Sequence, residues 1–430
     1  MSKSVGRNNS TTSGQSEALR LIVGVSGGIA AYKACHLVRL FKEDGAEVRV
    51  IPTPNALQFV GAATFEALSG NPVSTTVFSN IDTVQHVRLG QEADGIIIAP
   101  ATADLIARLA AGRVDDLLSA TVLVATCPII LAPAMHTEMW LNPATVENIA
   151  TLRRRGITVL EPASGRLTGV DSGPGRLLEP AQIAALSRTV LAGQKIVHNW
   201  AGKQVLITAG GTQEDIDPVR FIGNRSSGKQ GFALAELAAQ RGAQVNLVVG
   251  DTDELPTPAG AHITKVRSAR EMAAAVADLA PQADIVIMAA AVADFRPANP
   301  AAAKLKKGQH DESLAQLEMV ENPDILSTTV KRRSVGEIPA ETVIVGFAAE
   351  TGDAQHSPLE LAQAKLHRKG CDLLIYNDVS AGKTFGAPTN EGWILSEKDS
   401  VSPRELQFGS KQVVAAQILA AIDELLKEIA

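Results

Sequence analysis

Twice in this chain a short aliphatic run ends in a glycine turn and is followed by a helical pattern, and this repeated plan restricts the possible folds. Residues 21–25 lead into the turn at 26–28, and residues 204–208 lead into the turn at 209–212. Such uninterrupted aliphatic runs are typical of parallel strands that helices cover on both faces. Because strands and helices alternate in each half, we predict an α/β fold with two tandem Rossmann-like three-layer domains and mainly parallel sheets.

Further aliphatic runs extend both predicted sheets. In the first half, strands are expected at 47–51, 95–99, 128–132 and 158–160, and a helix at 29–43. In the second half, strands are expected at 244–249, 285–289, 342–347 and 372–376, with helices at 229–241 and 411–429. At 430 residues the chain is long enough for two such cores. The predicted domains are residues 19–190 and 203–430, joined by a linker at 191–202.

Composition argues against several classes of partner. The net charge of −6 gives the chain no general attraction to nucleic acid or to an anionic membrane. No apolar run reaches about 18 residues, so we expect no transmembrane helix. Three cysteines without CxxC spacing cannot form a paired framework, which favours a reducing cytoplasm as the location. Residues 1–18 are polar and lack the apolar stretch of a secretion signal, so we expect a disordered leader.

The first glycine turn, Ser26-Gly27-Gly28, is suited to a phosphate group, although glycines at such turns also serve plain packing. Glycines allow close backbone approach, and amide groups at the start of a helix attract an anion. The spacing differs from G-x-G-x-x-G and no acidic residue ends the second strand, so a mononucleotide is favoured over NAD. Two more loops, at 99–104 and 133–140, follow predicted strands of the same sheet. Thr102 and Asp104 are also suitable helix caps, which is the simpler interpretation of the first of these loops.

Four segments occur in the order found in flavin-dependent cysteine decarboxylases. They are VGVSGGIAAYK, QHVRLGQEAD, APATADLIARLAAG and PAMHTEMW. Residues 19–190 therefore resemble the decarboxylase half of the bifunctional coenzyme A biosynthesis family, which implies a flavodoxin-like, FMN-dependent domain. The implied reaction converts 4′-phosphopantothenoyl-cysteine to 4′-phosphopantetheine, with the flavin supplying the electron sink that the carboxylate lacks.

The resemblance also implies roles for particular residues of the first half. His86 would be the catalytic histidine, and His136 and Met139 would contact the substrate. The FMN contacts that it implies are Ser26, Gly27, Ile29, Thr53, Ala101, Thr102, Ala103 and Met135.

The first half departs from the family pattern at two positions. His136 stands where the family usually has Asn, which binds the substrate carboxylate, a role that histidine could partly fill by donating a hydrogen bond. Gly169 stands where a mobile clamp of the family carries a proton-donating Cys. Either Asp171, Thr168 or solvent delivers that proton, or the second half-reaction is slow. The alternative function is that only the second half is active and the first half is a degenerate flavin-binding module.

The second half contains a run that nearly matches a phosphate loop. Residues 223–230 read GNRSSGKQ, but Gln230 cannot supply the Mg²⁺-binding hydroxyl of G-x-x-x-x-G-K-[ST]. The run also begins well beyond the preceding strand. A serine-capped helix start at 226–228 is the simpler interpretation.

A longer set of segments resembles the phosphopantothenate–cysteine ligase half of the same family. It comprises TAGGTQEDIDPVRFIGNRSSGKQGFALAELAAQRGA, AAAVADFRP, KLKK, ENPDI and VGFAAET. The resemblance implies that residues 203–430 join cysteine to 4′-phosphopantothenate through an acyl-cytidylate made from CTP. Mg²⁺ would be held mainly through the CTP phosphates, and no protein ligand for it is predicted.

Three residues of the second half would then be catalytic. Asn224 would hold the acyl-cytidylate oxygens, Arg220 would assist the conversion with cysteine, and Lys304 would bind the triphosphate. The CTP contacts that the resemblance implies are Ala289, Ala290, Ala291, Asp294, Lys304, Asn322, Pro323, Asp324, Ile325, Phe347, Lys365 and Lys369. Trimers of the decarboxylase half and dimers of the ligase half in this family imply a homo-oligomer, a dodecamer.

Overall fold

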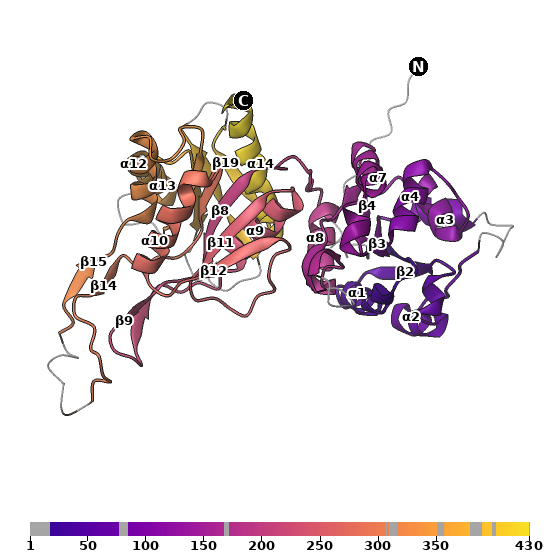
Figure 1. Ribbon diagram of the computed structural model, residues 1–430, viewed down its shortest axis with the longest axis horizontal. Coiled ribbons are helices and arrows are strands. Elements are labelled where there is room, and N and C mark those ends of the chain that lie inside the picture. The colour runs from indigo at the N-terminus through magenta and orange to yellow at the C-terminus, as the bar shows by residue number, and fades with distance from the viewer. Residues whose placement is uncertain are drawn as a thin grey trace, which may run out of the picture.

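The computed structural model describes residues 18–76, 85–166, 172–306, 308, 316–350, 357–378, 389–397 and 401–429. Residues 1–17 of the expected leader, and the clamp residues Thr168, Gly169 and Asp171, lie outside the described residues. The chain forms two α/β bodies that lie side by side, one from each half of the sequence (Figure 1). The predicted fold class is confirmed.

The first half is built on a five-stranded sheet whose strands are all parallel. The strands are β1 (Arg20–Val25), β2 (Glu47–Pro52), β3 (Gly95–Ala101), β4 (Ile129–Pro133) and β5 (Thr158–Val159). They lie in the order β2-β1-β3-β4-β5, which is the flavodoxin-like order. All five were predicted, with bounds that differ by at most two residues.

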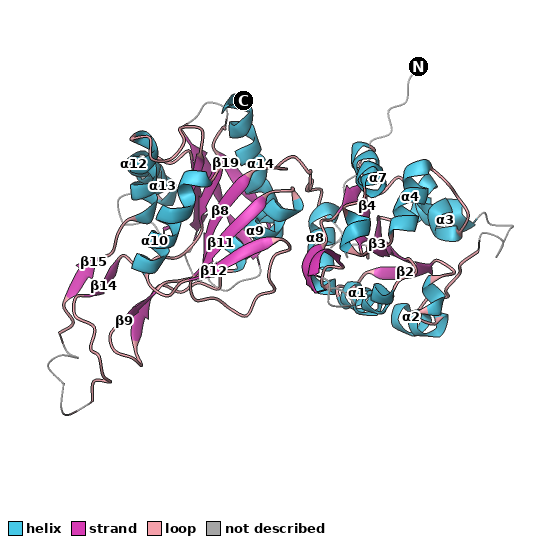
Figure 2. Cartoon of the chain, viewed as in Figure 1, coloured by secondary structure: helices cyan, strands magenta, loops and turns pink. Residues whose placement is uncertain are grey.

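Helices cover both faces of this sheet (Figure 2). They are α1 (Tyr32–Glu43), α2 (Ala62–Ser69), α3 (Gln85–Glu92), α4 (Ala103–Ala111), α5 (Leu117–Val124), α6 (Thr137–Trp140), α7 (Pro143–Arg154) and α8 (Pro180–Leu191). Alternate residues of β3 face opposite cores: Ile97 packs with α1 and α8, while Ile96 and Ile98 pack with α4, α5 and α7. This alternation explains why the strand is apolar throughout.

The second half is built on an eight-stranded sheet in the order β12-β11-β8-β13-β16-β17-β18-β19. The strands are β8 (Gln204–Ala209), β11 (Gln244–Val249), β12 (Ala261–Lys265), β13 (Ile285–Met288), β16 (Val343–Glu350), β17 (Leu373–Asp378), β18 (Thr389–Ser396) and β19 (Arg404–Ser410). The first six in this order are parallel, β18 is antiparallel to β17, and β19 is antiparallel to β18. After β8 the chain adds β11 and β12 on one side of β8, and from β13 onward it adds strands on the other side. A topological switch point therefore lies between β8 and β13.

The helices of the second half also form two layers. They are α9 (Lys229–Gln240), α10 (Ala269–Leu279), α12 (Ile325–Ser334), α13 (Pro358–Lys369) and α14 (Lys411–Ile429). Helices α9 and α14 share one core with Val205 and Ile207 of β8, whereas α10, α12 and α13 share the other with Leu206. The two layers therefore lie on opposite faces of the sheet.

Three short antiparallel pairs lie outside the main sheets. They are β6 (Ala163–Arg166) with β7 (Ser172–Arg176), β9 (Gln213–Asp215) with β10 (Phe221–Gly223), and β14 (Phe295–Pro297) with β15 (Met319–Glu321). In Figure 1, β9, β14 and β15 extend away from the second sheet. None of these pairs was predicted from the sequence.

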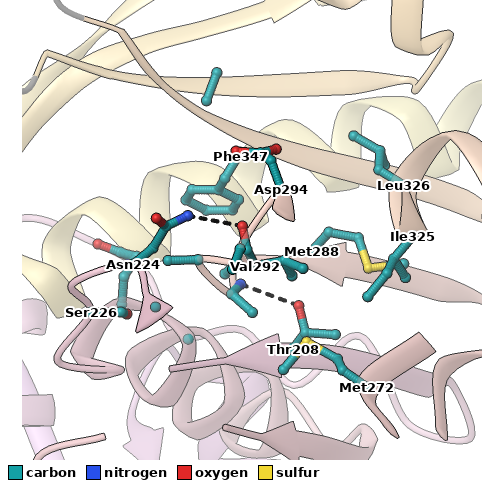
Figure 3. Close-up of a pocket in the computed structure, with 18 of the residues that line it drawn as sticks. Thr208, Asn224, Ser226, Met272, Met288, Val292, Asp294, Ile325, Leu326 and Phe347 are labelled. Atoms are coloured by element: carbon teal, nitrogen blue, oxygen red, sulfur yellow. Dashed lines mark hydrogen bonds between the residues drawn. The ribbon is translucent and has the colours of Figure 1, made fainter. Parts of the chain in front are cut away.

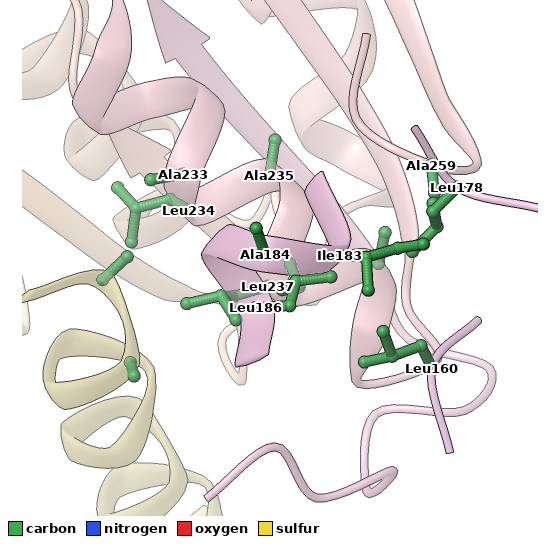
Figure 4. Packing of buried hydrophobic residues seen from close by; sticks show 14 of the residues in the cluster. Leu160, Leu178, Ile183, Ala184, Leu186, Ala233, Leu234, Ala235, Leu237 and Ala259 are labelled. Atoms are coloured by element: carbon green, nitrogen blue, oxygen red, sulfur yellow. The ribbon is translucent and has the colours of Figure 1, made fainter. Parts of the chain in front are cut away.

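Helix α8 packs against both halves of the molecule. Its Ile183, Ala184 and Leu186 belong to the same buried cluster as Leu234 and Leu237 of α9 (Figure 4). The side-chain amide of Gln182 donates hydrogen bonds to Oε2 of Glu236 at 2.9 Å and to the carbonyl of Thr257 at 3.1 Å. The core is therefore continuous from the first half into the second.

The segment between the halves is itself packed. Trp200, within the expected linker at 191–202, is fully buried, and its indole N–H donates to Oδ1 of Asp423 at 2.7 Å. The guanidinium of Arg241 lies over the Trp200 ring, 5.1 Å from its centroid. These contacts fix the end of the segment on the second half.

Candidate active sites

The first candidate site lies at the carboxyl ends of β1 and β3, where chain direction reverses in the first sheet. The hydroxyl of Ser26 donates to the carbonyl of Pro100 at 2.8 Å and accepts the amide N–H of Thr102 at 2.9 Å. The backbone N–H of Ser26 also donates to the Pro100 carbonyl at 3.2 Å. One buried side chain thus joins the turns after both strands, as expected for a ligand crevice at a switch point.

The glycine turn leaves amide groups available for a ligand. Within the described residues, no hydrogen bond is found for the backbone N–H groups of Gly27 and Gly28. An added Cβ at Gly27 would lie 2.5 Å from the Cβ of Asn55, so only glycine fits beside the loop after β2. Unpaired amides ahead of a helix suit a phosphate group.

The loop after β4 forms a third wall of this crevice. The amide N–H of Ala134 donates to the carbonyl of Ala101 at 3.1 Å, which places the loop beside the turn after β3. The β6–β7 hairpin covers it, because the N–H of Met135 donates to the carbonyl of Gly175 at 3.0 Å and the hydroxyl of Thr137 donates to the carbonyl of Pro174 at 2.8 Å. Strand β7, which follows the clamp residues, therefore lies against this loop.

The residues predicted to contact FMN all lie at the carboxyl ends of β1 to β4 or in the loops that follow. They are Ser26, Gly27, Ile29, Thr53, Ala101, Thr102, Ala103 and Met135. Thr102 occupies the N-cap position of α4 but its side chain makes no capping hydrogen bond, which leaves the hydroxyl for another partner. His136, at the end of the loop after β4, and Met139, in α6, were predicted to contact the substrate, and both are exposed.

His86 lies in the first turn of α3. Nδ1 of His86 and Oε1 of the adjacent Gln85 are buried and have no hydrogen-bond partner among the residues that the structure describes. Buried polar atoms without a partner are uncommon and indicate a missing ligand, water or chain segment. The sequence had singled out His86 but gave no signal for Gln85.

The second candidate site is a cavity of about 910 Å³ at the carboxyl ends of β8, β13 and β16. Figure 3 shows how its walls are held together. The side-chain amide of Asn224 donates to the carbonyl of Val292 at 2.9 Å, and the hydroxyl of Thr208 accepts the N–H of Ala290 at 3.2 Å. The volume suits a nucleotide or a ligand of similar size.

Most of the predicted ligase residues line this cavity. They are Asn224, Ala289, Ala290, Ala291, Asp294, Asn322, Pro323, Asp324, Ile325, Phe347, Lys365 and Lys369. Asn322 links the loop before α12 to the loop after β13, because its side-chain amide donates to the carbonyl of Ala293 at 2.9 Å and its backbone N–H donates to that of Asp294 at 2.8 Å.

Asp324 and Lys369 form an ion pair in the cavity wall. Asp324 also caps α12 by accepting the N–H of Ser327 at 3.0 Å. Burial alone would raise the pKa of Asp324, but the hydrogen bonds from Lys369 and Ser327 outweigh it and hold the pKa below its usual value. Asp324 is therefore an ionised structural partner of Lys369 in the absence of a ligand.

Two predicted catalytic residues do not line the cavity of their own chain. Arg220 pairs with Asp217 at 2.5 Å and donates to the carbonyl of Leu305 at 2.7 Å. This hydrogen-bonded guanidinium holds the pKa of Asp217 well below its usual range. Lys304 is exposed next to Leu305. Arg220 and Lys304 therefore lie outside the cavity wall that contains Asn224, on segments that extend from the sheet, and their assigned roles remain predictions.

The sequence did not identify several residues of the cavity wall. Ser226, Ser227 and residues 228–231 line it, although the GNRSSGKQ run had drawn attention to this segment. Lys411, at the start of the last helix, also lines it and carries no recognisable motif. Only the tertiary fold brings it to the cavity.

No group of three or more His, Cys, Asp or Glu side chains in the described part of the chain could hold a metal ion. No helix among the described residues is both long enough and apolar enough to cross a membrane.

Comparisons with known proteins agree with this two-part plan. The Flavoprotein family model matches residues 9–191, and the model of the DNA/pantothenate metabolism flavoprotein C-terminal domain matches residues 200–426. The coenzyme A biosynthesis bifunctional protein CoaBC of Mycolicibacterium smegmatis is 57% identical over 409 residues, covering 95% of this chain and 98% of that protein. The protein of the same name from Mycobacterium tuberculosis is 58% identical over 404 residues, covering 94% of this chain and 96% of the other.

Among solved structures, the C-terminal domain of a coenzyme A biosynthesis bifunctional protein CoaBC is 35% identical and matches with a TM-score of 0.43, covering 54% of this chain and 99% of that one. The fold and the family models define a protein in which a flavodoxin-like flavoprotein domain is fused to a second α/β domain. On the near-full-length sequence matches, the chain belongs to the family of coenzyme A biosynthesis bifunctional proteins. The resemblance predicted from the sequence motifs is confirmed.

Proposed function

We propose that the chain catalyses two consecutive steps of coenzyme A biosynthesis. The second half joins cysteine to 4′-phosphopantothenate with CTP, and the first half decarboxylates the resulting 4′-phosphopantothenoyl-cysteine to 4′-phosphopantetheine. The observation that carries the proposal is that each half places its predicted site residues at its own switch point and that both halves match their family models. The alternative, a degenerate first half, is not favoured because the first half matches the Flavoprotein family model and the near-full-length relatives are named as bifunctional proteins.

FMN fits the crevice of the first half. The free amides of Gly27 and Gly28 suit its phosphate, and Ser26 and Thr102 supply polar groups beside them. When bound, FMN supplies the reversible electron acceptor that makes loss of CO2 from a cysteinyl group feasible. The protein residues bind and orient the substrate: His136 donates a hydrogen bond to the substrate carboxylate, and Met139 contacts the substrate from the adjoining helix α6.

His86 is the proposed acid–base residue of the decarboxylase. Its buried Nδ1 has no partner among the described residues, so a proton held there can be exchanged with a ligand. The proton that the family takes from its clamp Cys comes here from Asp171, Thr168 or solvent, since Gly169 cannot supply it.

In the ligase half, Asn224 holds the oxygens of the acyl-cytidylate from one side of the cavity. Asp294 and the backbone of residues 289–291 contact the nucleotide, and Lys365 and Lys369 balance its phosphates. Mg²⁺ is bound through the CTP phosphates, in line with the small number of protein ligands that this ion usually takes. The remaining proposed nucleotide contacts are Asn322, Pro323, Asp324, Ile325 and Phe347.

We propose a homo-oligomer, as a dodecamer, in which the extended segments of one copy serve another. Arg220 and Lys304 lie on such segments and are absent from the cavity of their own chain, so a second copy would bring them to a cavity. The exposed Ile29 and Tyr32 beside the first crevice, at 64% and 62% exposure, suit a subunit contact in the first half. A cytoplasmic location fits the supply of all the proposed small-molecule substrates.

Each half has its own test. Purified protein mixed with 4′-phosphopantothenoyl-cysteine should release CO2 and form 4′-phosphopantetheine, and a His86→Asn variant should bind FMN but release no CO2. With CTP, Mg²⁺ and 4′-phosphopantothenate, the wild type should release pyrophosphate, and Asn224→Ala should not. Bound FMN without CO2 release by the wild type would refute the decarboxylase, and undiminished pyrophosphate release by Asn224→Ala would refute its assigned role.

A further inference from the structure

Asp217 is a buried carboxylate that has no assigned role in either reaction. It is 1% exposed and lies between β9 and β10, in the turn that also contains Arg220. Its oxygen Oδ1 accepts the backbone N–H groups of Val219 at 2.8 Å and of Arg220 at 2.9 Å, which closes the turn. A buried carboxylate is unfavourable unless both of its oxygens are paired, so the partners of Oδ2 matter as well.

The second oxygen of Asp217 joins this turn to a segment that is distant in the sequence. Oδ2 accepts hydrogen bonds from Nε and Nη2 of Arg220 at 3.0 and 2.5 Å, and from the backbone N–H of Leu305 at 3.1 Å. Nη2 of Arg220 also donates to the carbonyl of Leu305 at 2.7 Å. Both backbone groups of Leu305, the neighbour of Lys304, are therefore held by the pair of Asp217 and Arg220.

A further hydrogen bond joins the same two segments. The backbone N–H of Ala301 donates to the carbonyl of Ile216 at 2.9 Å. The turn and the segment therefore form one unit, which carries Arg220 on one strand of chain and the exposed Lys304 on the other. Since Oδ2 of Asp217 contacts both strands of chain, it is the buried group that connects them.

The pairing leaves one nitrogen of the Arg220 guanidinium available to a ligand. The side chain of Arg220 is 38% exposed, and its Nη1 has no hydrogen-bond partner among the residues that the structure describes. A guanidinium that meets a carboxylate through two of its nitrogens is fixed in its plane. Asp217 therefore sets the direction in which Nη1 of Arg220 points.

We propose that Asp217 is a positioning residue of the ligase, which holds Arg220 and Lys304 as one unit so that both reach the same reacting molecule. The inference rests on the proposed ligase function, in which Lys304 binds the triphosphate and Arg220 assists the later conversion with cysteine. Because Asp217 acts through both side chains, its loss should slow both steps, although it contacts neither substrate.

The first test is an Asp217→Asn variant of the full chain, which separates the tasks of the two oxygens. The amide oxygen can still accept the N–H groups that close the turn, whereas the amide nitrogen cannot accept those of Arg220 and Leu305. Pyrophosphate release and cysteine-dependent CMP release should both fall about tenfold to 100-fold, the scale of one lost hydrogen bond to a charged group. The loss should appear in kcat, and the KM for 4′-phosphopantothenate should stay within about twofold.

Asp215→Asn is the matched control, because it makes the same chemical change in β9 at an exposed ion pair with Arg267. It should keep both rates, as should CO2 release from 4′-phosphopantothenoyl-cysteine in Asp217→Asn. Unchanged ligase rates in Asp217→Asn, or an equal loss in Asp215→Asn, would overturn the proposal.

Double variants show whether Asp217 acts through the two residues that it holds. In a Lys304→Ala background, Asp217→Asn should cause little further loss of pyrophosphate release. In an Arg220→Ala background supplied with preformed acyl-cytidylate, it should cause little further loss of CMP release. Losses that multiply in full in both backgrounds would show that Asp217 acts elsewhere and would contradict the assignment.

Hydrogen exchange tests the connection without any activity. In Asp217→Asn, the peptide that contains Leu305 should lose protection, while peptides from the central strands β8 and β13 should keep theirs. Normal protection of Leu305, or loss of protection throughout residues 203–430, would overturn the proposal. Absence of CTP-dependent pyrophosphate release by the wild type would instead refute the proposed ligase, and the exchange result does not depend on it.

Discussion

The two glycine turns occupy equivalent places in their sheets but use their amide groups differently. In the first turn, the N–H groups of Gly27 and Gly28 have no hydrogen-bond partner within the described residues. In the second turn, Gly211 exchanges two backbone hydrogen bonds with Asp251, at 2.9 Å and 2.7 Å.

The second turn is closed further by the loop after β13. The N–H of Ala291 donates to the carbonyl of Gly210 at 2.8 Å, and the N–H of Thr212 donates to the carbonyl of Ala291 at 3.3 Å. The second turn does not line the cavity beside it. A strand followed by a glycine turn therefore indicates an α/β crevice but does not show whether the turn itself binds the ligand.

The largest expected effect is at the open turn. In Gly27→Ala, the new Cβ would lie 2.5 Å from the Cβ of Asn55 and 2.9 Å from its carbonyl carbon, so the turn must move. We expect FMN affinity to fall about 100-fold, the upper end of what overpacking of this kind costs, with CO2 release falling in parallel. FMN retained after dialysis, measured by absorbance, checks this.

Gly61→Ala is the matched control for that change, since no atom lies within 4 Å of its new Cβ. It should keep FMN and both activities. Ligase activity should survive in Gly27→Ala as well. Full flavin occupancy in Gly27→Ala would show that the turn is not the phosphate site.

A smaller effect is expected at the closed turn. In Gly211→Ala, the new Cβ would lie 2.6 Å from the carbonyl oxygen of Asn224, so the strain displaces a residue assigned to the ligase. We expect pyrophosphate release to fall about tenfold and the free energy of unfolding to fall by about 1–3 kcal/mol. Unchanged ligase kinetics, measured alongside normal CO2 release, would argue against a link between the turn and Asn224.

The hydroxyl of Thr212 should matter less for catalysis and more for stability. It is buried and accepts the N–H of Ala293 at 2.9 Å, next to the proposed nucleotide contact Asp294. Thr212→Val leaves that buried N–H unpaired, which we expect to cost about 1–3 kcal/mol of unfolding free energy. Chemical denaturation of Thr212→Val and Thr212→Ser would check this, because serine keeps the acceptor; equal losses in both would point to packing instead.

The smallest effect on either reaction is expected at the contact between the halves. Burial raises the pKa of Glu236 to about 7 from an ordinary 4.5, although Gln182, Ala259 and Gln240 donate hydrogen bonds to it. The folded protein therefore holds a proton that the unfolded chain releases between these values. Stabilisation by the protonated carboxyl is complete below about pH 4.5 and is lost as the pH rises through about 7.

Glu236→Gln should remove this part of the pH dependence. The melting temperatures of wild type and Glu236→Gln should be measured from pH 5 to 8. The difference between the two melting temperatures should change by several degrees over this range. Glu43→Gln, an exposed position paired with Arg39, should leave the wild-type profile unaltered. A constant offset between Glu236→Gln and wild type would show that Glu236 does not titrate in this range.

The sequence was sufficient for most of the two sheets because their strands are aliphatic and buried. The last helix was predicted with its observed bounds, Lys411–Ile429, and strand β11 likewise at Gln244–Val249. Strands β12, β18 and β19 were missed. β12 and β19 are the edge strands of the sheet and β18 lies beside β19. These strands contain polar residues such as His262 and Asn390, so they lack the aliphatic pattern.

The candidate sites were predicted less evenly. Loops directly after buried strands, such as those containing Ser26 and residues 289–294, lie where the strand order places them. Arg220 and Lys304 lie on extended segments whose direction depends on tertiary contacts, including the hydrogen bond from Arg220 to the carbonyl of Leu305. Lys411 lies at the start of the last helix, and only the packing of α14 against α9 brings it to the cavity.

The central claim is that two separate crevices carry out successive reactions on one molecule. The most direct measurement supplies 4′-phosphopantothenate, CTP, Mg²⁺ and cysteine labelled in its carboxyl group, and follows pyrophosphate and labelled CO2 together. The wild type should release both in equal amounts, whereas Gly27→Ala should still release pyrophosphate and accumulate 4′-phosphopantothenoyl-cysteine. Loss of both products in the folded Gly27→Ala variant, or pyrophosphate without CO2 from the FMN-loaded wild type, would contradict the account.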